Sequence, residues 1–182
     1  VLLPGRLGRE IVGDTLSLYR GFQLTGVRVS SVNDSWEPVW GENARIRNHY
    51  NELEIKLFQK DRATELVLRF RLFNDGLGFR YEFPRQKNLN YFVVRDELTE
   101  FRMAGDHKAF WLPGDYNTEE YRTTTTLLSG IVPKLKTRTL SVGENYPLYE
   151  NKGLYSVQTP LMMKSETGLY INIHEAALVG YP

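Results

Sequence analysis

Residues 50–83 read YNELEIKLFQKDRATELVLRFRLFNDGLGFRYEF, and this stretch decides the fold class. Apolar and charged residues alternate through three successive runs, with Leu53, Ile55 and Leu57 marking the apolar positions of the first. Because side chains of a β-strand point alternately to opposite faces, each run predicts a strand with one apolar face and one solvated, charged face. The NDG at residues 74–76 is typical of a tight hairpin turn. The stretch therefore predicts an antiparallel meander of three strands.

The alternation continues on both sides of this meander. Short runs predict further strands at residues 26–31, 37–40, 90–94, 97–103, 108–113, 154–158, 160–165 and 168–175. The SETG at residues 165–168 predicts a second hairpin turn, and no window has the apolar spacing of a long helix. With no repeat and no internal boundary, the chain is predicted to be one all-β domain, a sandwich or a barrel, over residues 1–182.

The composition excludes several classes of protein. The 182 residues include 23 basic and 22 acidic residues, which are interspersed and leave a net charge of +1. This balance predicts neither a nucleic-acid-binding surface nor a basic membrane patch. The absence of cysteine excludes disulfides, thiolate metal sites and a cysteine nucleophile. The chain begins VLLPGRLG, so we expect that a leader was removed or that the chain is part of a longer protein.

The polar segment at residues 113–126, PGDYNTEEYRTTTT, is predicted to be a long loop near a functional site. Glu119 and Glu120 point apart as neighbours on an extended chain, so they make a poor acid/base pair. Trp111 and Tyr116 are candidates for stacking on a sugar ring, although Trp111 is also interpretable as a core residue. The remaining candidate site residues are Asp106, His107, Asp115 and Glu175.

Glu175 raises a question about the last predicted strand. Leu169, Ile171 and Ile173 lie on one face of that strand, and Glu175 would follow them if the strand continued. An ionised carboxylate on an inward face is costly unless a cation or strong donors meet it. Three interpretations remain open at this point. The strand ends before Glu175, Glu175 pairs with a buried cation of the protein, or it binds a metal or substrate at the rim of a site.

Several segments resemble the N-terminal domain of glycoside hydrolase family 97. They are WEPVWGE, YNELEIKL, LVLRFRLFNDGLGFRYEFP, FWLPGDYNTEEY and GLYINIHEAALVGYP, and RLFNDGLGFRYEFP and INIHEAAL are the most specific. The family contains bacterial, largely periplasmic, exo-acting α-glucosidases and α-galactosidases. The resemblance implies an antiparallel β-sandwich, a galactose-mutarotase-like super-sandwich, as one domain of a larger enzyme whose (β/α)₈ barrel is absent from this chain.

The resemblance also implies a role for Glu175. The matching glutamate of the family reaches the active site and ligates calcium, while the other ligands and the catalytic carboxylates lie on the barrel. We therefore expect no catalytic residue in this chain, which alone would be inactive and bind calcium weakly or not at all. The implied partners are the barrel of the same enzyme and an α-linked oligosaccharide substrate, and the implied location is the periplasm.

Two other hypotheses remain open. The chain would be a stand-alone carbohydrate-binding β-sandwich without catalytic activity if Trp111, Tyr116 and Tyr121 formed a sugar platform. It would be a purely structural domain if it only stabilised its neighbour in the enzyme. Loss of calcium dependence after replacement of Glu175 distinguishes the accessory domain of a glycosidase from a structural domain.

Overall fold

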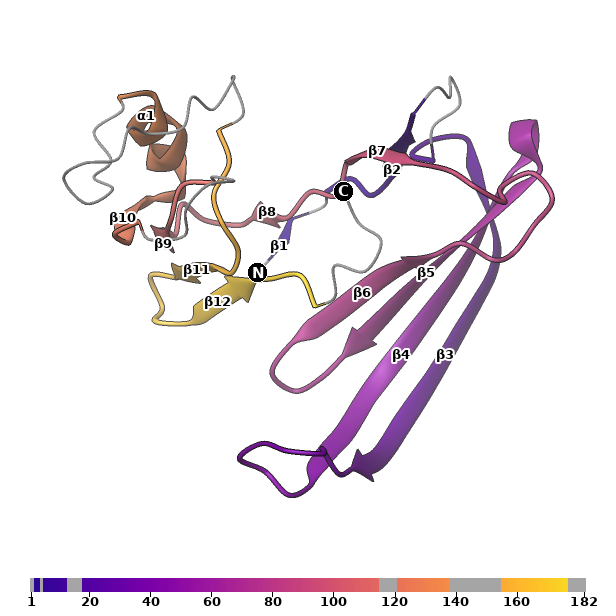
Figure 1. Cartoon of the computed structure of the whole chain (residues 1–182), viewed down its shortest axis with the longest axis horizontal. Helices are drawn as coiled ribbons and strands as arrows, with labels where there is room; N and C mark the ends of the chain where they lie inside the picture. Colours follow the sequence, from indigo (N-terminus) through magenta and orange to yellow (C-terminus); the bar gives the residue numbers. More distant parts are fainter. Residues whose placement is uncertain (1, 4, 13–17, 115–120, 138–154, 177–182) are drawn as a thin grey trace. The chain divides into compact units, whose positions relative to one another are not determined.

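The computed structural model describes residues 2–3, 5–12, 18–114, 121–137 and 155–176 (Figure 1). The chain divides into two compact units, one formed by Arg6–Thr99 and the other by the described residues of Val1–Gly5 and Glu100–Tyr181. Both units are built mainly of antiparallel strands. The predicted fold class, an all-β antiparallel β-sandwich, is confirmed, while the extent of the single domain stays a prediction.

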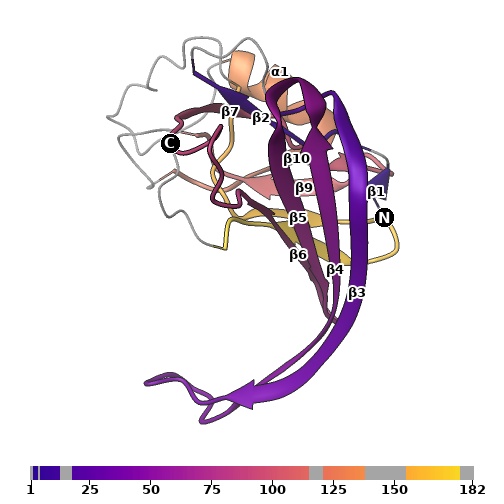
Figure 2. The ribbon, with the colours of Figure 1, turned by 90° about the vertical axis from the view of Figure 1, so that its right-hand side faces the viewer.

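The predicted meander is the centre of the Arg6–Thr99 unit. Its sheet has the order β3-β4-β5-β6 and every neighbouring pair is antiparallel. The strands are β3 (Phe22–Trp36), β4 (Ile46–Gln59), β5 (Thr64–Leu72) and β6 (Leu77–Glu82). The register places Leu53 opposite Phe70 and Phe70 opposite Phe79, so the apolar positions of the three predicted strands share one face. Figure 2 shows that β3 and β4 curve along their length.

The connections in this sheet have local causes. A short 3₁₀ turn, η1 (Lys60–Arg62), follows β4, and Ala63 then adopts the left-handed conformation with φ 47°. The predicted turn at residues 74–76 joins β5 to β6, and the N–H of Phe73 donates to the carbonyl oxygen of Gly76 at 2.8 Å. A bulge between Leu24 and Gly26 interrupts the register of β3 against β4. Bulges bend a strand and increase its twist, which agrees with the curvature of β3.

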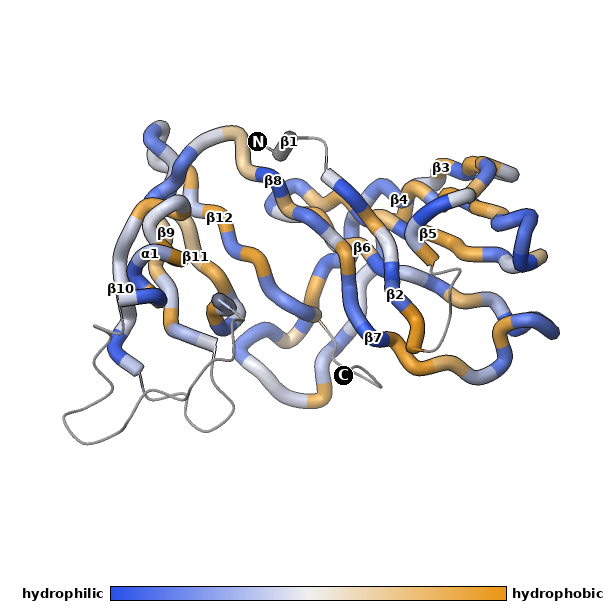
Figure 3. The backbone as a smooth tube through the Cα atoms, turned by 90° about the horizontal axis from the view of Figure 1, so that it is seen from above, coloured by the Kyte–Doolittle hydropathy of each residue, from blue (hydrophilic) through white to orange (hydrophobic). Residues whose placement is uncertain are grey.

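The apolar face of the sheet is unevenly buried. Leu66 and Leu68 in β5 are 2% and 7% exposed. Towards the edge and the far end of the sheet, five apolar side chains are more than half exposed, namely Leu24, Val27, Val29, Leu72 and Leu77. Figure 3 shows the alternation of hydrophobic and hydrophilic residues along these strands. The alternation therefore fixes which side chains share a face, but burial differs strongly along that face.

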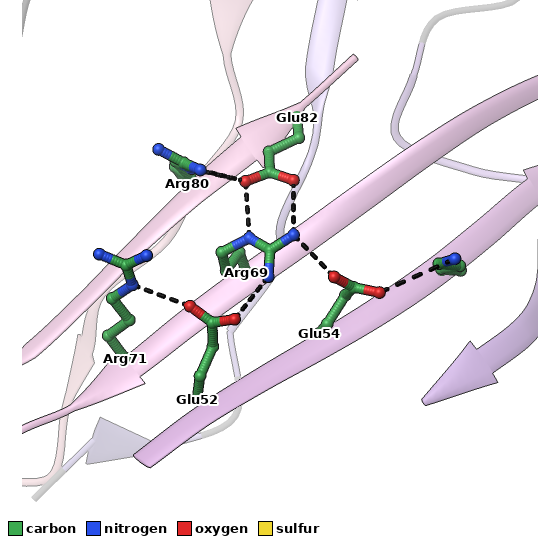
Figure 4. Close-up of polar contacts among 7 residues, drawn as sticks. Glu52, Glu54, Arg69, Arg71, Arg80 and Glu82 are labelled. Carbon is green, nitrogen blue, oxygen red and sulfur yellow. Dashed lines mark hydrogen bonds and ion pairs between the residues drawn. The ribbon is translucent and has the colours of Figure 1, made fainter. Parts of the chain in front are cut away.

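The opposite face carries an ion-pair network centred on Arg69 (Figure 4). The Nη1 of Arg69 lies 2.6 Å from Glu52 Oε1, and its Nη2 lies 2.7 Å from Glu54 Oε2. Arg69 is only 18% exposed, and the two glutamates are 11% and 13% exposed. Arg71 adds a second ion pair to Glu52 at 2.9 Å. The centre of the face predicted to be solvated is thus a largely desolvated network that ties β4 to β5, while Arg71 in the same network is 41% exposed.

A small sheet of β2 (Arg9–Ile11) and β7 (Val94–Glu97) completes this unit. Tyr81 connects it to the main sheet, because its hydroxyl oxygen accepts the N–H of Gly8 at 2.9 Å. Thr99 donates to Glu97 Oε1 at 2.5 Å, so the Tyr81 hydroxyl is the donor in its 2.7 Å bond to Thr99. Burial raises the pKa of Tyr81, which keeps this hydroxyl protonated as a donor.

The second unit contains a four-stranded sheet with the order β10-β9-β11-β12. Its strands are β9 (Lys108–Trp111), β10 (Thr124–Leu127), β11 (Leu161–Lys164) and β12 (Tyr170–Ile173), all antiparallel to their neighbours. Two short helices, η2 (Leu128–Gly130) and α1 (Ile131–Lys136), follow β10, and β1 (Leu2–Leu3) pairs with β8 (Arg102–Met103). The core of this unit contains Ala109, Trp111, Ile131 and Met163.

Some predicted strands are wrong. Residues 37–40 form no strand, and residues 154–158 contribute, in their described part, only a bridge between Val157 and Pro113. Conversely, Thr124–Leu127 lies partly in the predicted loop but pairs with β9. Threonine is β-branched and favours extended backbone, so a polar run of threonines forms a strand when a partner edge is available. In the described ranges, no helix is long and apolar enough to cross a membrane.

Candidate functional site

The β11–β12 hairpin places Glu175. Gly168 has φ 88°, and its N–H donates to Ser165 at 3.0 Å, so the predicted SETG turn is confirmed. The hairpin pairs Leu161 with Ile173 and Met163 with Ile171. Ile171 and Ile173 pack against the core cluster around Met163, which is fully buried. The apolar face of β12 thus holds the hairpin against the core of its unit.

Strand β12 ends at Ile173, two residues before Glu175. Glu175 is exposed and does not continue the apolar face. The first of the three open interpretations is therefore the one that the backbone supports, and no cation of the described residues pairs with this carboxylate. An exposed carboxylate directly after a strand remains compatible with binding a metal at the edge of the domain, so the predicted metal role stays a prediction.

One polar contact orients the Glu175 side chain. The hydroxyl of Thr159 donates a hydrogen bond to Glu175 Oε2. Thr159 lies two residues before Leu161, and Glu175 lies two residues after its partner Ile173. The hydrogen bond thus continues the cross-strand pairing of the hairpin beyond its last ladder residues. Sequence reasoning missed Thr159, although the predicted SETG turn and strict antiparallel register would have placed it opposite Glu175.

Glu175 fits calcium as one ligand among several. Calcium takes six to eight oxygen ligands, and an exposed carboxylate is a suitable donor. In the ranges that the structure describes, no group of three or more histidine and acidic side chains is arranged so that it could hold a metal ion. The described part of the chain thus supplies one carboxylate rather than a complete coordination shell.

Trp111 lies in β9 with 1% of its surface exposed. Its indole packs with Ala109, Ile131 and Met163, and its Nε1–H donates to Thr126 Oγ1 on the adjacent strand β10 at 3.0 Å. The structure therefore supports the interpretation of Trp111 as a core residue, and its substrate-binding role stays a prediction. Tyr116, the other predicted substrate contact, lies outside the described residues, as do Asp115, Glu119 and Glu120.

Asp106 and His107 lie at the other end of the sheet from Glu175. They directly precede β9, whose first residue Lys108 pairs with Lys164, at the turn end of the β11–β12 hairpin. Asp106 Oδ1 accepts the N–H of Ser129 at 2.8 Å, and Oδ2 accepts its hydroxyl at 2.6 Å. These bonds hold the pKa of Asp106 below its usual range. Asp106 thus fixes the short helix η2, and the structure does not bring it to Glu175.

His107 Nε2 is buried and has no hydrogen-bond partner among the described residues. Its backbone carbonyl accepts the N–H of Leu128 at 3.0 Å, so its main chain helps to hold η2. Tyr121, the third member of the proposed sugar platform, is 7% exposed. The described members of that platform, Trp111 and Tyr121, are thus both buried side chains.

Comparison with known proteins finds one family model that matches the whole chain and several similar solved structures. Residues 1–182 match the family model described as Glycosyl-hydrolase 97 N-terminal. A glycoside hydrolase family 97 enzyme from Pseudoalteromonas sp. strain K8, solved in complex with acarbose, is 30% identical and superposes with a TM-score of 0.79. A variant of this enzyme with a single substitution, solved in complex with panose, gives a TM-score of 0.77 at 30% identity. In both structures the similarity covers 98% of this chain and 24% of that chain.

A β-arabinopyranosidase structure is 18% identical, with a TM-score of 0.63 over 90% of this chain and 24% of that chain, and supports the fold alone. The chain thus spans about a quarter of the length of the solved enzymes that it matches. The similarity is confined to that part of each enzyme, and the remaining three quarters have no counterpart in these 182 residues.

Proposed function

The chain belongs to the glycosyl hydrolase 97 N-terminal family, and from this premise we propose that it is the accessory domain of a calcium-dependent, exo-acting α-glycoside hydrolase. In this proposal the domain closes one wall of the active site and supplies Glu175 as a calcium ligand. The observation that carries the proposal is the exposed carboxylate of Glu175, which lies two residues beyond the end of β12 and is oriented by Thr159.

The part of this chain in the reaction is to bind and orient. Calcium, when bound, would polarise and position the substrate in the active site. Glu175 would contribute one hard oxygen ligand to it, held at the end of a hairpin whose apolar face is fixed to the core. The general acid and the second carboxylate of glycoside hydrolysis would come from the remainder of the enzyme, so the chain alone would be inactive.

The substrate and the location belong to the same proposal. The related Pseudoalteromonas enzyme was solved with acarbose and with panose, which supports an α-linked oligosaccharide as the substrate class. The family resemblance supports a periplasmic location, which fractionation of the producing cells would test. The burial of Trp111 and Tyr121 does not favour the alternative of a stand-alone sugar-binding module.

The test is calcium titration by calorimetry on the full-length enzyme, comparing the wild type with Glu175→Gln. We expect the variant to bind calcium at least tenfold more weakly and to lose activity that excess calcium partly restores. Glu166→Gln is the matched control, because Glu166 is an exposed glutamate in the turn of the same hairpin. Calcium affinity unchanged by Glu175→Gln would refute the proposed role of this carboxylate.

A further inference from the structure

The contact between Thr159 and Glu175 is unusual for its setting. Both residues are exposed, and both lie outside the strands that they extend. Exposed side chains ordinarily exchange such hydrogen bonds with water, so burial does not enforce this one. It instead requires that the two backbones hold the side chains opposite each other.

The backbone on the Thr159 side is anchored on both sides of the residue. The N–H of Gln158 donates to the carbonyl oxygen of Leu112 at 2.9 Å, and Val157 forms a bridge with Pro113. Val157 and Leu161 both pack against the core cluster around Trp111 and Met163. The Thr159 hydroxyl is thus a donor at a fixed position, whereas Glu175 extends past the last paired residue of β12.

The hydrogen bond leaves one carboxylate oxygen available. Thr159 engages Oε2, and Oε1 of Glu175 accepts no hydrogen bond from the residues that the structure describes. A glutamate side chain has several rotatable bonds, and a ligand that is already oriented loses less conformational freedom on binding. Carboxylates that bind metals are typically held in this way by a hydrogen-bonding partner that does not itself touch the metal.

We infer that Thr159 is a positioning residue, which holds the Glu175 carboxylate with one oxygen directed to a divalent cation. The inference rests on the proposed role of Glu175 and extends it to a second residue of this chain. Thr159 acts through its hydroxyl alone, so its methyl group is dispensable. The hydroxyl sets the geometry of Glu175 and makes no bond to the cation.

The test compares Thr159→Val, which keeps the shape and removes the hydroxyl, with Thr159→Ser, which keeps the hydroxyl and removes the methyl. The readout is the calcium dissociation constant of the full-length enzyme, measured by calorimetry. We expect Thr159→Val to weaken calcium binding about tenfold, at the lower end of the range for such partners, and Thr159→Ser to stay within about twofold. Thr167→Val is the matched control, because Thr167 is an exposed threonine in the turn of the same hairpin.

Four results are informative. Weakening by valine with rescue by serine, and no further weakening by valine in the Glu175→Gln background, supports the inference. Wild-type affinity in Thr159→Val, combined with loss in Glu175→Gln, overturns the inference and leaves the proposed function intact. Equal weakening by valine and serine shows a packing role and also overturns it. Unchanged affinity in Glu175→Gln overturns the proposed function and this inference together.

Discussion

Arg69 binds Glu82 through two parallel hydrogen bonds, from Nε to Oε1 at 2.6 Å and from Nη2 to Oε2 at 2.9 Å. Since Arg69 also binds Glu52 and Glu54, one guanidinium neutralises carboxylates from the strands on either side of it. Replacing Arg69 with Met would leave three carboxylates together on a poorly solvated face. We expect a loss of about 3 kcal/mol in the free energy of unfolding, the lower bound for breaking a buried ion pair.

Urea unfolding of the purified protein measures this loss. The control is Arg80→Met, because Arg80 also binds Glu82 but its side chain is 65% exposed. Exposed ion pairs contribute at most about 1 kcal/mol, so this variant should remain close to the wild type. Equal losses of unfolding free energy in the two variants would show that the ion pairs of Arg69 stabilise the fold no more than the exposed ion pair of Arg80.

The same network predicts how stability depends on pH. The hydrogen bonds from Arg69 lower the pKa of Glu82 from 4.5 to about 2. A carboxyl whose pKa is lower in the folded state contributes stability above its unfolded pKa and loses it as the pH falls towards the folded pKa. We therefore expect the contribution of Glu82 to be complete above pH 4.5 and to disappear between pH 4.5 and 2.

Unfolding midpoints between pH 2 and 6 check this prediction. Glu82→Gln should lower stability at pH 6 and show a shallower decline on acidification than the wild type. Glu37→Gln serves as the control, because Glu37 is exposed just after β3. A decline in Glu82→Gln as steep as that of the wild type would assign the acid sensitivity to other carboxyl groups.

Trp111 offers a test that separates packing from substrate binding. Trp111→Ala removes a fully buried indole and should cost about 4 kcal/mol, as expected for a large cavity in a core. Trp111→Phe keeps part of the volume and loses the hydrogen bond to Thr126, so it should cost less. Kinetics of the full-length Trp111→Phe enzyme, below its unfolding temperature, should give a wild-type kcat/KM. A raised KM with an unchanged unfolding temperature would instead support the predicted contact with substrate.

Ala63 is a position where a substitution should stabilise the protein. Its φ of 47° and ψ of 49° are left-handed, a conformation that glycine adopts without the steric cost of a Cβ atom. Ala63→Gly should therefore raise the free energy of unfolding by about 0.5–1 kcal/mol, after the greater flexibility of glycine in the unfolded chain is counted. Urea unfolding of the variant measures this gain.

Gly78 in β6 supplies a control in the opposite direction, because it allows a glycine to be replaced by alanine at a position without left-handed backbone. Its φ lies outside the left-handed range, and a Cβ atom added there meets nothing within 4 Å. Gly78→Ala should therefore be tolerated, because it restricts the unfolded chain without straining the strand. Destabilisation by Ala63→Gly would contradict the prediction for the left-handed position.

Alternation of residue types predicts the meander well, because each of its strands has one apolar and one charged face. The same alternation underestimates the length of β3. Only residues 26–31 alternate clearly, yet the strand extends over Phe22–Trp36. The additional residues are extended because they pair along the whole of β4, an influence that no local window contains. The charged face is predicted to be solvated, but cross-strand geometry gathers Glu52, Glu54 and Glu82 around Arg69 and largely desolvates them.

The candidate site is predictable only in part. Glu175 is identified from a family resemblance, and the pattern alone does not show that β12 ends at Ile173. Trp111 and Tyr121 are predicted for a sugar platform, but an aromatic residue in a short strand has the same local sequence whether it faces a ligand or a core. Thr159 is missed because an exposed threonine carries no signal of its own. Its role emerges only from the register of the hairpin.

The pairing of β2 with β7 has a consequence for how the chain is made. Glu10 and Arg95, which form an ion pair across these strands, are 85 residues apart in sequence. At translation rates of about 5–20 residues per second, β2 leaves the ribosome on the order of 10 s before its partner strand. The hairpin of β5 and β6 has no such delay, since its strands are consecutive. The meander can thus form during synthesis. Strand β2 is made before the meander but can pair with β7 only after the meander has been made.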